Sequence, residues 1–186
     1  TGMTHMAFVR STEAHALIKG IDVSAALECE GVIGAWTAAD LELPPLPEVP
    51  GLERPTLATD KVRFVGEAVA VIVAESKYAA ADGTELVVVD YEPLEAVTNI
   101  EEATAEDAPL LFEELGSNTV AEVPSADDHQ SVFDSAPHTE KIKLINNRCT
   151  AAPIETSACL ADYGPAGLTI WASFQAPHHL RNRISA

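Results

Sequence analysis

The chain is poor in basic residues. Of its 186 residues, 11 are lysine or arginine and 29 are aspartate or glutamate, which gives a formal net charge of −18. No basic stripe offsets this excess, so nucleic acid would be repelled and is excluded as a partner. Pairs of adjacent acidic residues occur at 101–102, 106–107, 113–114 and 127–128. We interpret them as part of a solvated face that aids solubility.

Cysteine is scarce and metal-ligand spacing is absent. The three cysteines, Cys29, Cys149 and Cys159, are widely spaced and form no C-x-x-C pair, so neither a zinc knuckle nor an iron–sulfur motif is predicted. We expect them to be reduced, buried thiols of a cytoplasmic protein. His178 and His179 are adjacent and would point about 100° apart on a helix, which disfavours a shared metal ion. We therefore predict no metal ligand in this chain.

Long apolar runs and glycine-rich phosphate loops are also missing. The longest apolar run, residues 68–74, is too short to span a bilayer, and no signal peptide precedes Met3. The absence of a glycine-rich cradle excludes a P-loop and a dinucleotide fingerprint. No cysteine has a candidate base beside it, so we predict no catalytic residue here. Because the chain begins at Thr1 without an initiator methionine, we interpret it as an excised or processed segment.

The hydrophobic pattern of the first half predicts two strand–helix–strand units. Strands are expected over 3–10, 16–23, 32–36, 68–73 and 86–91. Ser24 and Ser76 are predicted N-caps of the two helices, and Gly31 ends the first. Gly83 is expected to weaken the second helix. These units predict an α+β fold, with a mixed sheet and helices packed on it.

Two irregular stretches accompany these units. Residues 41–55 carry five prolines and are expected to form an extended surface loop. Residues 92–139 form an acidic connector, with a helical turn expected at 99–103, packing of 108–112 on the domain, and irregular structure over 116–136. Alternation resumes over 140–146. We place a domain boundary near Thr139, which gives domains at 1–139 and 140–186.

The last part of the chain predicts a hairpin followed by a helix. Strands are expected at 159–163 and 168–174, joined by a Gly-Pro-Ala-Gly turn. Alternation puts Thr169, Trp171 and Ser173 on one face, and it puts Leu168, Ile170 and Ala172 on the other. Gln175 falls between the strand and a helix that begins at Pro177, where chains often present polar groups to ligands. From the residues alone, Gln175 is well placed but is more often a cap or turn residue.

Glu155 is a second polar residue of interest in this part. It follows an apolar run, residues 151–154, so if buried it needs a partner such as Arg148 or a backbone amide. We expect a structural role for it.

Several motifs resemble one enzyme family. Pro-Ile-Glu-Thr at 153–156, followed by Trp-Ala-Ser-Phe-Gln-Ala-Pro-His at 171–178, is similar to the large, molybdenum-binding subunit of the xanthine dehydrogenase and aldehyde oxidase family. The Glu-Thr-x-x-Cys-x-Ala run at 155–161 most resembles the branch of aerobic carbon monoxide dehydrogenase large subunits. Residues 5–11 and 62–70 look like the α/β hammerhead domain that opens these subunits. The family commonly has proline where Thr12 stands, which is a small departure.

The resemblance implies an architecture and a site. It implies a hammerhead domain at 1–139, followed by the truncated start of a molybdenum-cofactor-binding domain at 140–186. In the family, the glutamine that matches Gln175 lies beside the oxo group of the molybdenum centre without ligating the metal. The pyranopterin-binding segments and the catalytic glutamate of the family would lie beyond Ala186. The resemblance therefore implies a molybdopterin cytosine dinucleotide-type cofactor in the full-length enzyme, with none bound to this fragment.

The resemblance also implies a function. Family members oxidise carbon monoxide, aldehydes or N-heterocycles with water as the oxygen source, and pass electrons to iron–sulfur and FAD subunits. These subunits and the remainder of the large subunit are the implied partners, and the fragment alone is expected to be inactive. The alternative is a stand-alone, non-catalytic hammerhead module for assembly or interaction. Leu168, Ile170 and Trp171 would be left partly exposed, which predicts self-association of the isolated chain.

Overall fold

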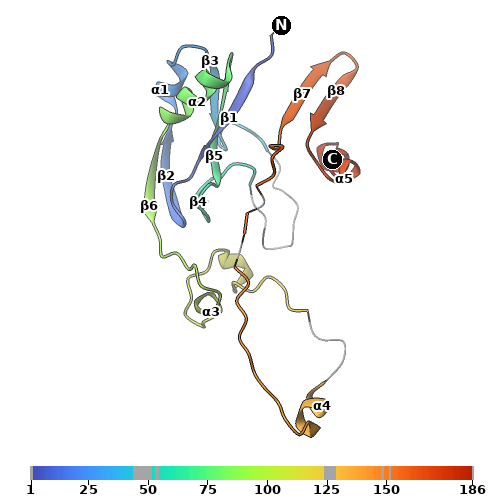
Figure 1. Cartoon of the computed structure of the whole chain (residues 1–186). Helices are drawn as coiled ribbons and strands as arrows, with labels where there is room; N and C mark the ends of the chain where they lie inside the picture. The colour runs from blue at the N-terminus through green and yellow to red at the C-terminus, as the bar shows by residue number, and fades with distance from the viewer. Residues whose placement is uncertain are drawn as a thin grey trace. The chain divides into compact units, whose positions relative to one another are not determined.

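The computed structural model describes residues 2–43, 52, 55–123, 129–147, 149–150 and 152–185 (Figure 1). The chain divides into two compact units, Thr1–Ser125 and Ala126–Ala186. The domain boundary near Thr139 stays a prediction. Most of the proline-rich loop at 41–55 lies outside the described residues.

Two three-stranded sheets make up the first unit. One has the order β1-β5-β3 and the other β4-β2-β6. The strands are β1 (His5–Arg10), β2 (Ala16–Asp22), β3 (Val32–Thr37), β4 (Lys61–Val62), β5 (Ala68–Ala74) and β6 (Val88–Pro93). The helices between them are α1 (Ser24–Leu27) and α2 (Lys77–Glu85). The predicted α+β class is confirmed.

The predicted mixed sheet is wrong, because every strand pair described is antiparallel. Helix α1 is flanked in the chain by β2 and β3, which lie in different sheets. Helix α2 is flanked by β5 and β6, which also lie in different sheets. Each helix therefore connects the two sheets. A crossover makes parallel neighbours only when both of its strands belong to one sheet.

The core of this unit is shared by both sheets and centred on β5. This strand is hydrogen-bonded on both edges, to β1 and to β3, and it is the most apolar stretch of the chain. Val69 and Ile72 of β5 are completely buried, as are Ala16 of β2 and Val62 of β4. When an apolar strand has partners on both edges, its main-chain N–H and C=O groups are hydrogen-bonded. It can therefore be buried without leaving polar groups unpaired.

Helix α2 begins as the sequence predicts. The Ser76 side chain accepts a hydrogen bond from the Ala79 N–H at 3.1 Å, which confirms Ser76 as the N-cap. Gly83 has a packing role that the sequence does not reveal. A Cβ at this position would lie 2.9 Å from Ile72 Cγ2 and 3.0 Å from Val32 Cγ2. The glycine thus allows close approach of α2 to β5 and β3.

Helix α1 begins differently. Ser24 is its first residue and Val23 is the N-cap, with no side-chain cap hydrogen bond. The predicted Ser24 N-cap is wrong, because the helix already begins at Ser24, whose N–H donates to Asp22 Oδ1 at 2.9 Å. Gly31 follows the helix with φ of +82°, a conformation in which glycine is unstrained.

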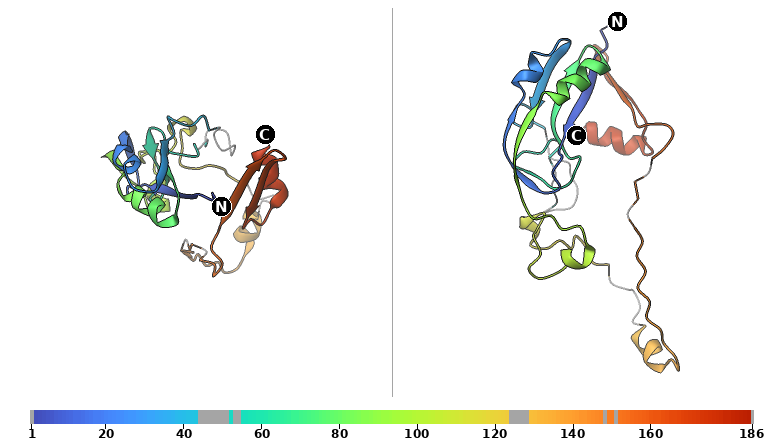
Figure 2. Two further views of the ribbon diagram at one scale, coloured as in Figure 1. Left: turned by 90° about the horizontal axis from the view of Figure 1, so that it is seen from above. Right: turned by 60° about the vertical axis from the view of Figure 1, so that its left-hand side comes forward.

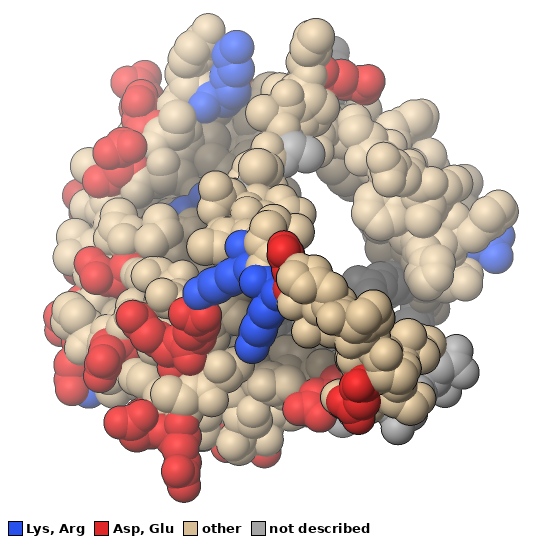
Figure 3. All heavy atoms as spheres, turned by 60° about the horizontal axis from the view of Figure 1, so that its bottom comes forward, with Lys and Arg blue, Asp and Glu red and all other residues tan. Residues whose placement is uncertain are grey.

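The acidic connector is structured along part of its length. Helix α3 (Ile100–Ala103) is capped by the Asn99 side chain, which confirms the helical turn expected at 99–103. Arg63 Nε donates to the Leu111 carbonyl at 3.1 Å, and its guanidinium lies 4.9 Å from the Phe112 ring centroid. The predicted packing of 108–112 on the domain is confirmed. A 3-10 helix, η1 (Glu113–Leu115), follows, and acidic side chains are widely spread over the face in Figure 3.

The second unit contains α4 (Gln130–Ser135), β7 (Cys159–Gly164), β8 (Gly167–Ala172) and α5 (Pro177–Ile184) (Figure 2). Helix α4 contradicts the irregular structure predicted for all of 116–136. The alternating stretch at 140–146 forms no strand: these residues are exposed and have no strand partner among the described residues. Alternation alone does not stabilise a strand that lacks a neighbour. No helix in the described ranges is long and apolar enough to cross a membrane.

Candidate cofactor-binding site

The candidate site is built on the β7–β8 hairpin. Its antiparallel pairing runs from Cys159 opposite Ala172 to Gly164 opposite Gly167, so Pro165 and Ala166 form the turn. Gly167 has φ of +110°, which a residue with a side chain rarely adopts. Beyond the hairpin, the Ser173 N–H donates to the Ala158 carbonyl at 3.0 Å and extends the pairing. The predicted hairpin is confirmed.

Gln175 lies in the short connection between β8 and α5, as the sequence predicts. Strand β8 ends at Ala172 and α5 begins at Pro177. The Gln175 side chain is exposed and makes no hydrogen bond within the described part of the chain. Its position is confirmed, and its role beside a cofactor stays a prediction.

The N-terminal end of α5 beside Gln175 has no side-chain cap. The N-cap residue is Ala176, which offers no side-chain acceptor, and Pro177 has no N–H to donate. The first-turn N–H groups that follow have no partner within the helix, and the helix dipole adds partial positive charge at this end. The backbone donors and the Gln175 amide therefore lie at one end of α5, where they suit an anionic or oxygen-rich ligand.

An apolar groove of about 390 Å³ runs beside these donors, between β8 and α5. Its walls are mainly apolar side chains that alternate along β8 and just beyond its end, and that recur at i, i+4 on α5, namely Leu168, Ile170, Ala172, Phe174, Leu180 and Ile184. The predicted division of β8 into two faces is confirmed, because Leu168, Ile170 and Ala172 all line the groove. Leu180 and Ile184 were not predicted as groove residues, although their i, i+4 spacing indicates one helix face.

Other residues considered for chemistry do not gather into a site. Among the described residues, no group of three or more His, Cys, Asp or Glu side chains could hold a metal ion. His178 and His179 are both exposed. Glu155 is exposed as well, so it needs no buried partner. Its suggested partner Arg148 lies outside the described residues.

The expectation of buried thiols is wrong for two of the three cysteines. All three are free, but Cys149 and Cys159 are exposed and Cys29 is half-buried. In the described residues of the second unit the hairpin has no sheet packed against it, so alternation of polar and apolar residues does not bury Cys159.

Comparison with known proteins identifies both parts of the chain. Residues 1–95 match the family described as aldehyde oxidase and xanthine dehydrogenase, a/b hammerhead domain. Residues 111–186 match the molybdopterin cofactor-binding domain. The second match begins inside the first compact unit, where Leu111 contacts Arg63 and Glu113 contacts Lys61.

Individual relatives agree with these matches. The carbon monoxide dehydrogenase large chain of Afipia carboxidovorans is 37% identical over 99% of this chain and 25% of its own length. The nicotine 6-hydroxylase large subunit of Paenarthrobacter nicotinovorans is 38% identical over 99% of this chain and 24% of its own length. The crystal structure of quinoline 2-oxidoreductase from Pseudomonas putida 86 superposes with a TM-score of 0.88 at 35% identity, covering 100% of this chain and 25% of that one.

The chain thus spans about a quarter of the length of the relatives it matches. The hammerhead match covers more than half of the 186 residues, and the antiparallel two-sheet unit, the β7–β8 hairpin and α5 fall within the two matched regions. The chain belongs to the aldehyde oxidase and xanthine dehydrogenase family, with a hammerhead domain followed by sequence of the molybdopterin cofactor-binding domain.

Proposed function

We propose that this chain is part of the large subunit of a molybdenum hydroxylase, and that Gln175 lies beside the cofactor there. The observation that carries the proposal is the unpartnered Gln175 amide at the uncapped end of α5, within the molybdopterin-domain match. A neutral amide donates a hydrogen bond without adding charge. The first-turn N–H groups of α5 add partial positive charge. These donors fit an anionic, oxygen-rich group such as a molybdopterin cytosine dinucleotide.

Each part of the site has a proposed task. Gln175 would donate a hydrogen bond and orient the group, while Leu168, Ile170 and Phe174 would exclude water from the groove beside it. When bound, the cofactor would supply oxidation of the substrate with oxygen derived from water, and electrons would pass to iron–sulfur and FAD subunits. We assign no catalytic residue to this chain. We therefore propose that it is inactive alone and needs the remainder of the large subunit.

The substrate class is proposed only as carbon monoxide, an aldehyde or an N-heterocycle. Large subunits named for carbon monoxide and for nicotine are 37% and 38% identical to this chain, so this region does not favour one substrate over another. We propose a cytoplasmic location, which the three free cysteines support. Exposed Leu168 and Trp171 support self-association of the isolated chain, which light scattering would test.

The test is the intact mass of the native polypeptide in its source organism, with molybdenum measured on the same purified sample. We expect a mass several times that of this chain, stoichiometric molybdenum, and cytidine monophosphate released on acid hydrolysis. A different nucleotide would overturn only the cytosine form of the cofactor. A mass equal to that of this chain without molybdenum would overturn the proposal in favour of a stand-alone hammerhead module.

A further inference from the structure

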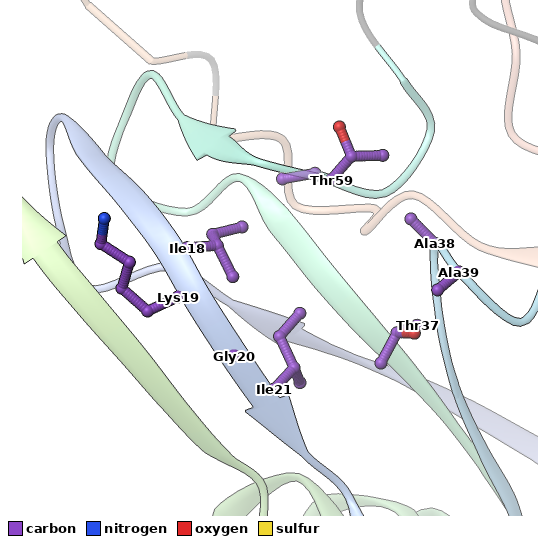
Figure 4. Close-up of a pocket in the computed structure, with 9 residues that line it drawn as sticks. Ile18, Lys19, Gly20, Ile21, Thr37, Ala38, Ala39 and Thr59 are labelled. Carbon is purple, nitrogen blue, oxygen red and sulfur yellow. The ribbon is translucent and has the colours of Figure 1, made fainter.

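A slot of about 340 Å³ lies in the first unit, between β2 and the end of β3 (Figure 4). Residues 18–21 of β2 form one wall, residues 37–39 form the other, and Ala58 with Thr59 closes one end. Figure 4 shows Ile18 and Ile21 projecting from β2 toward the slot, whereas Lys19 points to the other side of the strand. The molybdenum chemistry proposed above makes no use of this slot.

The slot exists because β2 loses its neighbour on one side. Strand β2 pairs with β6 along its whole length, but β4 pairs only with Ala16 and Leu17. The Ile18 N–H still donates to the Asp60 carbonyl at 2.8 Å. Two residues earlier in the chain, the Ala58 N–H donates to the Ala68 carbonyl of β5 at 2.8 Å. Ala58 therefore bonds to the β1-β5-β3 sheet and not to β2. In the described residues, positions 19–22 therefore have no strand on the slot side.

The facing wall also ends in an unpaired edge. Strand β3 is the outermost strand of its sheet and pairs only with β5 among the described strands. Unpaired strand edges present main-chain donors and acceptors to any extended chain that fits beside them. The slot thus lies between two such edges.

The backbone of β2 is accessible at the middle of the slot. The register with β6 shifts between Ile18 and Gly20, which is a bulge at Lys19. A Cβ at Gly20 would meet no atom within 4 Å, so the side of the main chain to which a Cβ would point is open. A bulge followed by glycine is a common arrangement where another backbone approaches closely.

The rim of the slot is acidic. Asp40 and Asp60 are exposed, and their carboxylates accept hydrogen bonds from the wall residues Thr37 and Thr59. Asp22, also exposed, follows the wall residue Ile21 in the chain. The one lysine of the wall, Lys19, is paired with Glu92 at 2.5 Å, so its charge is offset. Hydrogen bonds from Ser24 lower the pKa of Asp22, and those from Thr37 lower the pKa of Asp40, so both stay ionised at neutral pH. A basic segment complements this charge better than a second copy of this chain, whose net charge is −18.

We propose that this slot docks a basic segment of a partner polypeptide, which adds to the free edge of β2 as an extended strand. Main-chain hydrogen bonds to residues 19–22 supply affinity, as in other cases of strand addition. A small apolar side chain of the segment enters between Ile18 and Ala38. Lysine or arginine side chains on either side meet the aspartate rim, which fixes register and speeds encounter.

Three labelled peptides of equal length test the proposal on the purified 186-residue chain. The first alternates lysine and valine, the second is the same sequence N-methylated at every residue, and the third has glutamate in place of lysine. The second peptide keeps the charge but cannot donate main-chain hydrogen bonds, so it measures nonspecific attraction to the acidic surface. In fluorescence anisotropy we expect the first to bind about tenfold more tightly than the second, and the third not to bind. Equal binding of the first two would overturn strand addition.

Variants place the binding at the slot. Ala38→Leu should fill it and weaken the lysine–valine peptide about tenfold. Thr59→Leu fills it from another side, so the result does not depend on how the turn at Ala38 tolerates the larger residue. Ala81→Leu, on the exposed face of α2, is the matched control and should bind as the parent does. Amide NMR shifts on binding should concentrate at residues 19–22. Unchanged affinity in both slot variants, or shifts confined to β6, would overturn the proposal.

Discussion

Lys61 and Glu113 form an ion pair that joins the acidic connector to the hammerhead domain. Lys61 Nζ lies 2.6 Å from Glu113 Oε1 and 2.8 Å from Oε2. The Lys61 side chain is only 4% exposed, whereas that of Glu113 is 68% exposed. The ammonium group is thus withdrawn from water, and Glu113 is its carboxylate partner. Arg63 reinforces the contact through the Leu111 carbonyl and the Phe112 ring.

The first prediction is that Glu113→Gln lowers the free energy of unfolding of the first unit by about 1–2 kcal/mol, because it leaves the buried ammonium without a carboxylate. The exposure of Glu113 keeps the loss below that of a fully buried pair. Lys61→Met should cost less, since it removes the charge that needs a partner. Urea unfolding would measure both in a Trp171→Phe background, where Trp36 reports on the first unit.

Glu114→Gln is the matched control for this pair. Glu114 is the exposed neighbour of Glu113, and its neutralisation should change the unfolding free energy by less than about 0.5 kcal/mol. An effect of Glu114→Gln equal to that of Glu113→Gln would mean that net charge, and not the pair, sets the stability.

The second prediction concerns acid. The hydrogen bond from Lys61 lowers the pKa of Glu113 from its ordinary value of 4.5. Because the unfolded chain then binds the proton more readily, the stabilisation is present above pH 4.5 and is lost as the pH falls through the folded-state pKa. The difference in unfolding free energy between parent and Glu113→Gln should therefore shrink below that pH. A constant difference across the titration would contradict the assignment.

The third prediction is that Gly83→Ala destabilises the first unit, although alanine is the better helix former. The gain in helix propensity is about 1 kcal/mol. The new Cβ would lie within 3.0 Å of methyl groups of Ile72 and Val32, and overpacking of this kind costs about 1–3 kcal/mol. The melting temperature should fall. Asp82→Ala is the control: Asp82 is adjacent and exposed, so this change raises helix propensity without adding a buried atom. It should not lower the melting temperature.

The features of the fold that could be predicted from the sequence are those that depend on residues close together in the chain. The Ser76 cap and the β7–β8 turn each rest on residues within a few positions, and both were predicted correctly. The sheet membership of β2 and β3 was not, because strand–helix–strand order does not state which sheet receives the second strand. The role of Gly83 depends on Ile72 and Val32, which are distant in the sequence.

The candidate site shows the same division. The location of Gln175 between strand and helix followed from alternation and Pro177, and it is confirmed. Outside the site, the Lys61–Glu113 pair was not predicted either, since its partners are separated by 52 positions. The exposure of Cys159 was missed because alternation predicts burial only where a second layer covers the sheet.

The fourth prediction tests Gln175 in the full-length molybdenum-loaded enzyme, and it rests on the proposed function. Gln175→Ala should reduce turnover by about 10- to 100-fold, as removal of a hydrogen bond beside a metal centre commonly does. Gln175→Glu should be worse, because it places a carboxylate where an anionic group is expected. Molybdenum content and the electron paramagnetic resonance spectrum of the reduced enzyme would be measured on each variant.

The control for Gln175 is Ser173→Ala, two residues away and also exposed, which should leave turnover and spectrum unchanged. If Gln175 touches the cofactor, Gln175→Ala alters the spectrum while molybdenum content stays near that of the parent. A normal spectrum together with lower molybdenum content would indicate that Gln175 serves only to join β8 to α5. A normal spectrum, normal content and normal turnover would remove Gln175 from the site, because a neutral amide beside the metal cannot be lost without an electronic effect.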